Sequence, residues 1–296
     1  MPVLTIDNLS KKYGPVQALK NVSFTVPKGC VFGILGPNGS GKTTLLGTIM
    51  DVLKPTSGSY LLFDEMPTEN QRKGIGTLLE TPNFYHYLSG EDNLQISAAI
   101  KGRGKEDIPR VLEMVNLTQR KDSKFNTYSL GMKQRLAIAS CLLGNPEVLV
   151  FDEPTNGLDP VGIAEIRELM KRLHQEGKTI IMASHLLDEV EKVCTHVAIL
   201  KKGELIASGD VNAILVNEDL IEISAGDMVK LKEVTAKLKE VTTIKQDGNM
   251  LQLFYPAGRA DMGEVNKFCF ENGIVLTHLL LKKKSLEAKF FELTNN

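Results

Sequence analysis

The sequence predicts an α/β protein with a parallel β-sheet, an antiparallel β flank and a helical insertion, followed by a smaller α+β domain. Up to about Gly209, short apolar β-branched runs such as residues 30–35, 148–151 and 179–183 alternate with amphipathic segments. This alternation is typical of a parallel sheet covered by helices. After residues 201–204, which have the composition of a hairpin turn, the order of the elements changes.

The length of 296 residues predicts about two domains. With 35 Lys+Arg against 36 Asp+Glu the net charge is −1, so binding to bulk nucleic acid is disfavoured. The four cysteines form no C-x-x-C pair, which argues against a structural zinc site or a redox dithiol. Without a signal peptide or 18 consecutive apolar residues, we expect a cytosolic chain that needs another subunit to span a membrane.

The elements of the first domain, residues 1–215, fall into two groups besides the parallel strands. Residues 4–6, 18–19 and 22–26 alternate between apolar and polar positions and are joined by short Gly and Pro turns, which predicts the antiparallel flank. From about residue 89 to residue 143 the pattern is helical, and this segment is the predicted insertion. Its apolar residues recur at helix spacing in three segments, residues 91–100, 108–115 and 130–143.

The second domain, residues 216–296, has an order of its own. The Asp247-Gly248 pair between alternating runs predicts a hairpin. The remaining expected elements are a strand over 219–225, a helix over 228–240, a helix over 261–272, a strand over 274–281 and a last helix after Ser285. This β-α-β-β-α-β order predicts a ferredoxin-like unit.

A phosphate-binding loop follows the apolar run 30–35. Residues 36–43 fit the pattern G-x-x-x-x-G-K-[ST], and a helix expected to run through Met50 and stop at Pro55 follows them. The glycines let backbone N–H groups surround phosphate oxygens, and the helix presents its positive end. Lys42 is expected to reach the β- and γ-phosphates, and the Thr43 hydroxyl to hold Mg²⁺. The nucleotide-binding residues are then Gly36, Pro37, Asn38, Gly39, Ser40, Gly41, Lys42, Thr43 and Thr44.

Two carboxylates follow the apolar run 148–151. Asp152 is placed to hold Mg²⁺ directly or through water, and Glu153 is placed to act as general base for the attacking water. Such a pair at a strand end is also compatible with solvated surface acids. Beside a phosphate-binding loop, the catalytic interpretation is favoured.

Together with residues 128–135, these motifs resemble those of an ABC-transporter nucleotide-binding subunit. The resemblance extends from Val3 to about Gly209. It implies a P-loop NTPase fold with a RecA-like parallel sheet, and an ATPase that uses ATP and Mg²⁺ and couples hydrolysis to transmembrane transport. A glutamine-loop position and a D-loop at residues 157–159 complete the family's order of motifs.

The resemblance also assigns roles to residues outside the phosphate-binding loop. Tyr13 corresponds to the aromatic residue that stacks on adenine, although a surface strand tyrosine is the alternative. His185 corresponds to the switch histidine that contacts the γ-phosphate, with a satisfied core histidine as the alternative. Ser129, Gly131 and Asp159 act in trans in the family, because the signature of one subunit closes on the nucleotide of another. A head-to-tail dimer is therefore implied.

This sequence departs from the family pattern at two places. In the signature, Leu130 replaces the first Gly and Met132 the Gln, while Ser129 and Gly131 remain. At the glutamine-loop position the residue is Glu80. A carboxylate there is expected to stay ionised, to ligate the metal more strongly than Gln, and to repel the γ-phosphate, which predicts turnover with an altered metal preference.

Residues 80–94 are similar to the bacitracin-resistance and lantibiotic-immunity branch of ABC exporters, which implies export of a peptide antibiotic or another amphiphile. The partner is then a transmembrane permease, and the subunit lies on the cytoplasmic face of the cell membrane. The aromatic and apolar side chains of this segment either receive a helix of that permease or pack within the insertion; they are Phe84, Tyr85, Tyr87 and Leu88. The alternative function is a soluble ABC ATPase that acts on ribosomes or DNA.

Overall fold

The computed structural model describes residues 1–79, 83–215, 219–256 and 258–283. The chain divides into two compact units, Met1–Asp210 and Val211–Asn296, each with a hydrophobic core of its own. Helix α8 (Val211–Leu215), which the expected boundary places in the first domain, groups with the second unit.

The first unit is built around a six-stranded sheet with the order β5-β6-β7-β3-β8-β9. Its strands are β3 (Val31–Leu35), β5 (Ile75–Leu78), β6 (Val148–Asp152), β7 (Thr179–Ser184), β8 (His196–Lys201) and β9 (Glu204–Asp210). All neighbouring pairs are parallel except the hairpin of β8 and β9. Strands β3, β6 and β7 are buried along their whole length, as expected of parallel strands covered on both faces.

The antiparallel flank forms a three-stranded sheet with the order β2-β1-β4. It contains β1 (Pro2–Tyr13), β2 (Val16–Pro27) and β4 (Ser57–Leu62). The sequence analysis missed β4, because its first residues, 57–59, lack apolar alternation. A Cβ on Gly58 would collide with the carbonyl oxygen of Asn8, so glycine lets β4 approach β1 closely.

The core of the first unit includes side chains from the flank, the larger sheet and helix α1 (Lys42–Ile49). Phe24 and Phe32 stack with ring centroids 5.3 Å apart. Helix α1 ends at Ile49, short of the predicted stop at Pro55. The chain turns at Asp51, whose φ is +63°.

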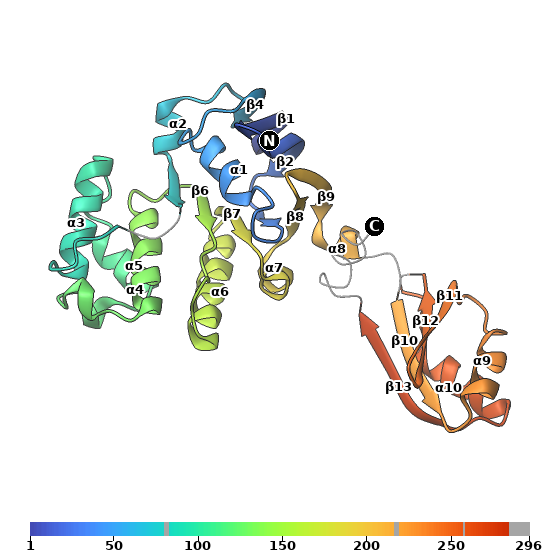
Figure 1. The fold of residues 1–296 in the computed structure, drawn as a ribbon. Coiled ribbons are helices and arrows are strands. Elements are labelled where there is room, and N and C mark those ends of the chain that lie inside the picture. The colour runs from blue at the N-terminus through green and yellow to red at the C-terminus, as the bar shows by residue number, and fades with distance from the viewer. Residues whose placement is uncertain (80–82, 216–218, 257, 284–296) are drawn as a thin grey trace. The chain divides into compact units, whose positions relative to one another are not determined.

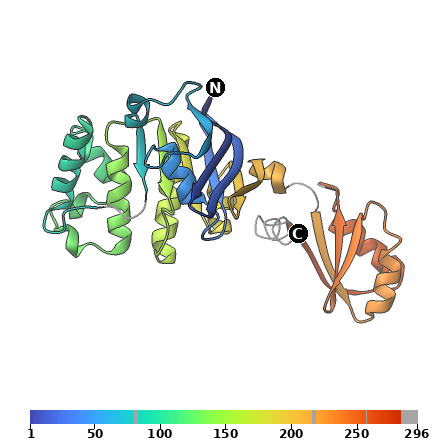
Figure 2. The ribbon, with the colours of Figure 1, turned by 45° about the horizontal axis from the view of Figure 1, so that its top comes forward.

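The helical insertion consists of α3 (Gly90–Lys101), α4 (Ile108–Met114) and α5 (Leu130–Leu142), with 3₁₀ turns at Thr118–Arg120 and Phe125–Thr127. Figures 1 and 2 show these helices grouped at one side of the first unit, where α5 packs against β5. The other helices of this unit are α2 (Glu69–Lys73), α6 (Pro160–Gln175) and α7 (Leu187–Val193). The predicted insertion is therefore present.

The second unit contains a four-stranded antiparallel sheet with the order β11-β12-β10-β13. Its elements are β10 (Asp219–Ala225), α9 (Met228–Thr235), β11 (Thr243–Asp247), β12 (Met250–Tyr255), α10 (Met262–Glu271) and β13 (Leu276–Lys283). Helix α9 ends earlier than the predicted residue 240, and the hydroxyl of its last residue, Thr235, donates to the carbonyl of Leu231. The helix expected after Ser285 lies outside the described residues.

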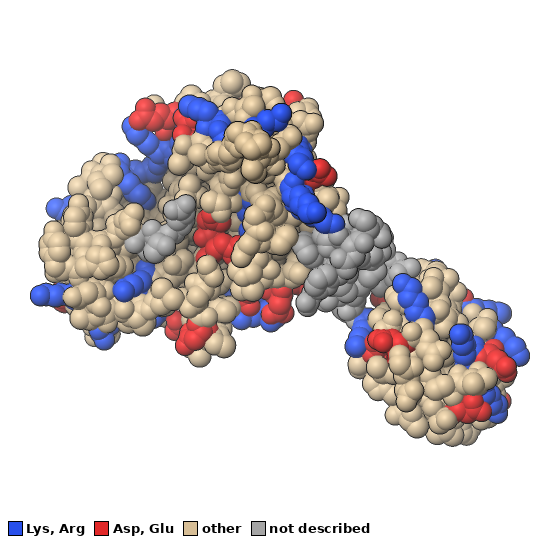
Figure 3. Space-filling model, in the orientation of Figure 1, with Lys and Arg blue, Asp and Glu red and all other residues tan. Residues whose placement is uncertain are grey.

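On the faces that Figure 3 shows, Lys and Arg lie among Asp and Glu, in keeping with the net charge of −1. Within the part of the chain that the structure describes, no helix has both the length and the apolar character needed to cross a membrane.

Candidate functional site

The phosphate-binding loop joins the end of β3 to the start of α1, as the sequence predicts. Two of its glycines are required by space. A Cβ on Gly36 would collide with the Ser40 hydroxyl and the Leu200 carbonyl, and one on Gly41 would lie 2.6 Å from the Ala18 carbonyl oxygen. Gly41 also has φ +107°, a conformation that residues with a side chain rarely adopt. The loop is therefore tightly folded against β2 and β8.

Helix α1 begins without a side-chain cap. Its first intrahelical hydrogen bond runs from the Leu45 N–H to the Gly41 carbonyl, so the N–H groups before Leu45 have no partner within the helix. This end of the helix faces a cavity of about 300 Å³. The cavity is lined by Ala18, Asn38, Gly39, Gly41, Lys42, Thr43, Thr44 and Glu153. Free N–H groups and the helix dipole make this cavity suited to an anion such as a phosphate.

The Lys42 side chain is buried, with 5% of its surface exposed. Its Nζ atom donates to the Gly36 carbonyl at 2.8 Å and lies 3.2 Å from Oε1 of Glu153. A buried ammonium group is stable only when it is paired. These contacts hold the charge of Lys42 at the cavity, where phosphate oxygens are an alternative partner.

Glu153 links Lys42 to His185. Its Oε2 atom lies 2.7 Å from Nδ1 of His185, while its Oε1 atom contacts Lys42. The backbone of Glu153 has φ +48°, and its N–H donates to the Ala183 carbonyl at the end of β7. The surrounding structure thus holds this residue in a strained conformation that aims its carboxylate at the cavity.

Asp152 is the last residue of β6 and is 5% exposed. It is level with Ala183 of the neighbouring strand β7, next to the residues that position Glu153. Thr43, another predicted metal ligand, lines the phosphate-binding cavity. Both residues carry oxygen atoms, the ligand type that Mg²⁺ prefers. The buried Ser40 hydroxyl in the same loop has no hydrogen-bond partner among the described residues.

These residues fit a Mg²⁺ ion that is shared with a bound nucleotide. In the described parts of the chain, no group of three or more His, Cys, Asp or Glu residues is arranged to hold a metal. Mg²⁺ is commonly bound through one or two protein ligands together with substrate phosphates, and it does not need such a cage. Thr43 and Asp152 would supply that number of ligands.

Tyr13 lies at the end of β1 and is 45% exposed. It is not among the residues that line the phosphate-binding cavity. The Nζ atom of Lys11 lies 5.2 Å from the centre of its ring. The exposed ring is available for stacking, and its role as an adenine platform stays a prediction.

The residues predicted to act in trans lie at two other helix starts, and none of them lines the phosphate-binding cavity. Ser129 precedes α5 and its Oγ accepts a hydrogen bond from the Met132 N–H at 3.3 Å. Asp159 precedes α6 and caps it through the Gly162 N–H at 2.9 Å. A Cβ on Gly131 would meet no atom within 4 Å, so this part of the α5 surface is open.

The predicted metal residue Glu80 lies outside the described residues. The aromatic segment after it is divided between two environments. Phe84 is half-buried and packs edge-on against Phe125 within the insertion, with centroids 5.2 Å apart. Tyr85 and Tyr87 are 50% and 66% exposed. Of the two alternatives for this segment, packing within the insertion is therefore correct for Phe84, and the two tyrosines remain on the surface.

The sequence analysis missed two residues that shape this site. Ala18 of β2 lines the cavity and lies against Gly41. The fully buried Ser184 accepts a hydrogen bond from the Leu186 N–H at 3.0 Å and so fixes the turn that contains His185. Ser184 could have been identified in the sequence because it directly precedes His185. Nothing in the local sequence distinguishes Ala18 from other strand residues.

The chain is similar to several known proteins. A family model described as "ABC transporter" matches residues 19–156. The bacitracin transport ATP-binding protein BcrA of Enterococcus faecalis is 35% identical over 300 residues, which cover 98% of this chain and 96% of that protein. The lantibiotic transport ATP-binding protein SrtF of Streptococcus pyogenes is 38% identical over 204 residues, 69% of this chain and 89% of that protein.

A solved structure shows the same fold. It is a dimeric ATP-binding cassette in a post-hydrolysis state with ADP and Pi, with TM-score 0.62 and 28% identity over 70% of this chain and 98% of that one. The chain described here belongs to the ATP-binding proteins of ABC transporters. It is an ATPase subunit that binds ATP, as the sequence predicts.

Proposed function

We propose that this chain binds MgATP in the cavity between the phosphate-binding loop and Glu153 and hydrolyses it by water attack, with Glu153 as general base. The contact of one Glu153 carboxylate with both Lys42 and His185 carries the proposal. Lys42 neutralises the β- and γ-phosphates when ATP enters, and this releases Glu153 to accept a proton from water. His185 orients that carboxylate and contacts the γ-phosphate.

Thr43 and Asp152 hold the Mg²⁺ ion in this proposal, and Glu80 contributes to it from the glutamine-loop position. When bound, the ion neutralises charge on the phosphates and orients the γ-phosphate. The backbone N–H groups at the start of α1 and the residues 36–44 bind the phosphates. Tyr13 supplies the stacking surface for adenine.

The active form in our proposal is a head-to-tail dimer in which Ser129, Gly131 and Asp159 of one subunit complete the site of the other. None of the three lines the phosphate-binding cavity of its own subunit. The open surface at Gly131 leaves room for a nucleotide presented by a second chain. A homologous cassette that was solved as a dimer with ADP and Pi supports the dimeric form.

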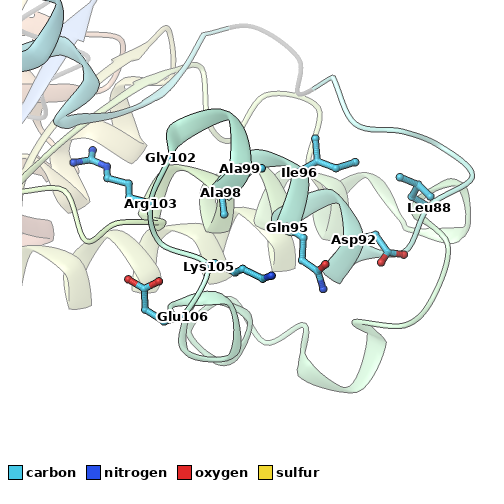
Figure 4. A pocket seen from close by; sticks show the side chains of 10 residues that line it. All are labelled: Leu88, Asp92, Gln95, Ile96, Ala98, Ala99, Gly102, Arg103, Lys105 and Glu106. Carbon is cyan, nitrogen blue, oxygen red and sulfur yellow. The ribbon is translucent and has the colours of Figure 1, made fainter.

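The transported substrate is, in our proposal, a peptide antibiotic or another amphiphile, as the names of the bacitracin and lantibiotic relatives suggest. The subunit then works on the cytoplasmic face of a membrane, beneath a permease. The exposed Tyr85 and Tyr87 and the neighbouring surface of α3 offer it a docking surface. A cavity of about 730 Å³ opens along this helix, and Figure 4 shows the apolar Leu88 and Ile96 among charged side chains around it.

We propose further that residues 216–296 form a ferredoxin-like accessory domain. The antiparallel strand order β11-β12-β10-β13 and the connection of β10 to β11 through α9 support this classification. The match to BcrA extends over 98% of the chain, so that relative has a comparable second region.

A substitution of the base tests the proposed mechanism. Glu153→Gln keeps the size of the side chain but cannot accept a proton at neutral pH, so turnover should fall by about 10²–10⁴-fold. ATP should remain bound and the dimer should accumulate, as measured by phosphate release and by light scattering after gel filtration.

A matched control lies at the other end of the same strand. Glu147 directly precedes β6 and pairs with Lys28 on the surface, so Glu147→Gln should leave turnover unchanged. Hydrolysis by Glu153→Gln at the wild-type rate would exclude Glu153 as the base. Co-purification with a multi-spanning membrane protein, rather than with ribosomes, tests the transporter assignment separately.

A further inference from the structure

The second unit contains a cavity of about 330 Å³ that the nucleotide chemistry does not use. It lies between the residues after α9, the end of β12 and the start of α10. All of its lining residues belong to this unit. Its size is within the range of small-molecule sites.

Tyr255 gives this cavity an unusual polar feature. The side chain lines the cavity, is 4% exposed, and its hydroxyl has no hydrogen-bond partner among the described residues. A buried polar group without a partner costs about 1–3 kcal/mol, so a ligand that accepts or donates a hydrogen bond there is favoured. Burial, together with the nearby Glu264, raises the pKa of Tyr255 to about 12. The hydroxyl is therefore protonated at neutral pH and can donate a hydrogen bond.

The charged side chains around the cavity are of both signs. Lys237, Lys239 and Arg259 supply positive charge, and Glu240, Asp261 and Glu264 supply negative charge. In the part of the chain that the structure describes, none of these six side chains lies within salt-bridge distance of an opposite charge. Asp261 caps α10 by accepting the N–H groups of Gly263 and Glu264, and the other five side chains are available to a ligand that carries both charges.

The apolar part of the lining limits the ligand further. Val265 is buried, and Leu238 and Phe268 are half-buried, so the cavity also offers apolar contact. We propose that this cavity binds a small zwitterion with an apolar part, such as a free amino acid with an apolar side chain. This inference does not depend on the proposed mechanism of ATP hydrolysis.

Ligand-observed NMR on the full-length protein tests the site. The probes are the free L-amino acids with apolar side chains, each compared with its N-acetyl and its amide derivative. At least one free amino acid should bind with a dissociation constant in the millimolar range or below. Because each derivative removes one charge, both should bind about tenfold more weakly or worse.

Two variants locate the binding. Tyr255→Phe removes only the hydroxyl without a partner, so it should not lower the melting temperature, yet it should weaken binding about tenfold. Arg259→Gln should weaken binding of the free amino acid but not of its amide. Lys245→Gln, which alters an exposed lysine of β11 outside the cavity, is the matched control and should bind normally.

Two results would overturn the proposal. One is the absence of binding by every free apolar amino acid tested at millimolar concentration. The other is binding that Tyr255→Phe and Arg259→Gln leave at the wild-type level, since it would lie elsewhere on the protein.

Discussion

The start of α1 is predicted to bind phosphate and the start of α5 to close on the nucleotide of another subunit, and the two differ in how their N–H groups are satisfied. Helix α1 follows Gly41, which supplies no side-chain cap. Helix α5 follows Ser129, whose hydroxyl accepts the Met132 N–H. A missing cap leaves backbone donors free, and a serine cap satisfies one of them within the chain.

The surroundings of the two helix starts also differ. The α1 start faces a cavity that also contains the buried Lys42 and Glu153. The α5 start carries Leu130, 53% exposed, and an open surface at Gly131. The start of α1 thus faces charged groups of its own chain, whereas the start of α5 is exposed on the surface. This difference is the one that our proposal requires between a phosphate site within one subunit and a site that acts in trans.

The largest expected effect tests the α1 side. Lys42→Ala removes the buried charge of the cavity, so ATP turnover should fall by at least about a hundredfold. Phosphate release measures turnover, and equilibrium dialysis measures ATP binding. Lys28→Ala is the control, since Lys28 also pairs with a glutamate but on the surface, and its turnover should remain at the wild-type level. Normal turnover by Lys42→Ala would remove the distinction between the two helix starts.

A smaller effect on ATP binding is expected from a substitution within the phosphate-binding loop. Gly41→Ala places a Cβ 2.6 Å from the Ala18 carbonyl at φ +107°, so the unfolding free energy should drop by about 1–3 kcal/mol. ATP affinity should fall about tenfold, because the loop must move away from β2. Thermal unfolding and ATP titration measure the two quantities.

A substitution at a second glycine tests whether Gly41→Ala acts only through backbone strain or also through damage to the phosphate-binding loop. Gly177, between α6 and β7, has φ +85°, and a Cβ added to it would meet no atom within 4 Å. Gly177→Ala should therefore lower stability through its backbone conformation alone, without changing ATP affinity. Equal losses of ATP affinity in the two variants would show that the effect of Gly41→Ala is not local.

The smallest expected effect sharpens the comparison on the α5 side. Ser129→Ala removes a helix cap, so the unfolding free energy should fall by about 1 kcal/mol. Ser89→Ala removes the serine cap of α3 and should cost a similar amount. Only Ser129→Ala should also lower ATP turnover at concentrations where dimers form. If both variants hydrolyse ATP equally well, the Ser129 hydroxyl has no role beyond capping.

Much of the nucleotide site is contiguous in the chain and was therefore predictable. The strand, loop and helix around residues 36–43 form one local pattern, and Glu153 and His185 each directly follow an apolar strand. The contact of Lys42 with Glu153 was not predictable from either segment, because it depends on how β3 and β6 are placed in the sheet. Ala18 joins the cavity for the same reason.

Local sequence patterns determined where strands alternate with helices, which glycines permit the phosphate-binding loop, and which acidic residues lie at strand ends. These features arise from backbone preferences and from the periodicity of apolar side chains, which act over a few residues. Packing between distant segments fixed the rest: the pairing of β4 with β1, the link from Lys42 through Glu153 to His185, and the cavity at Tyr255. Such contacts depend on burial and close approach, which exist only once the whole unit has folded.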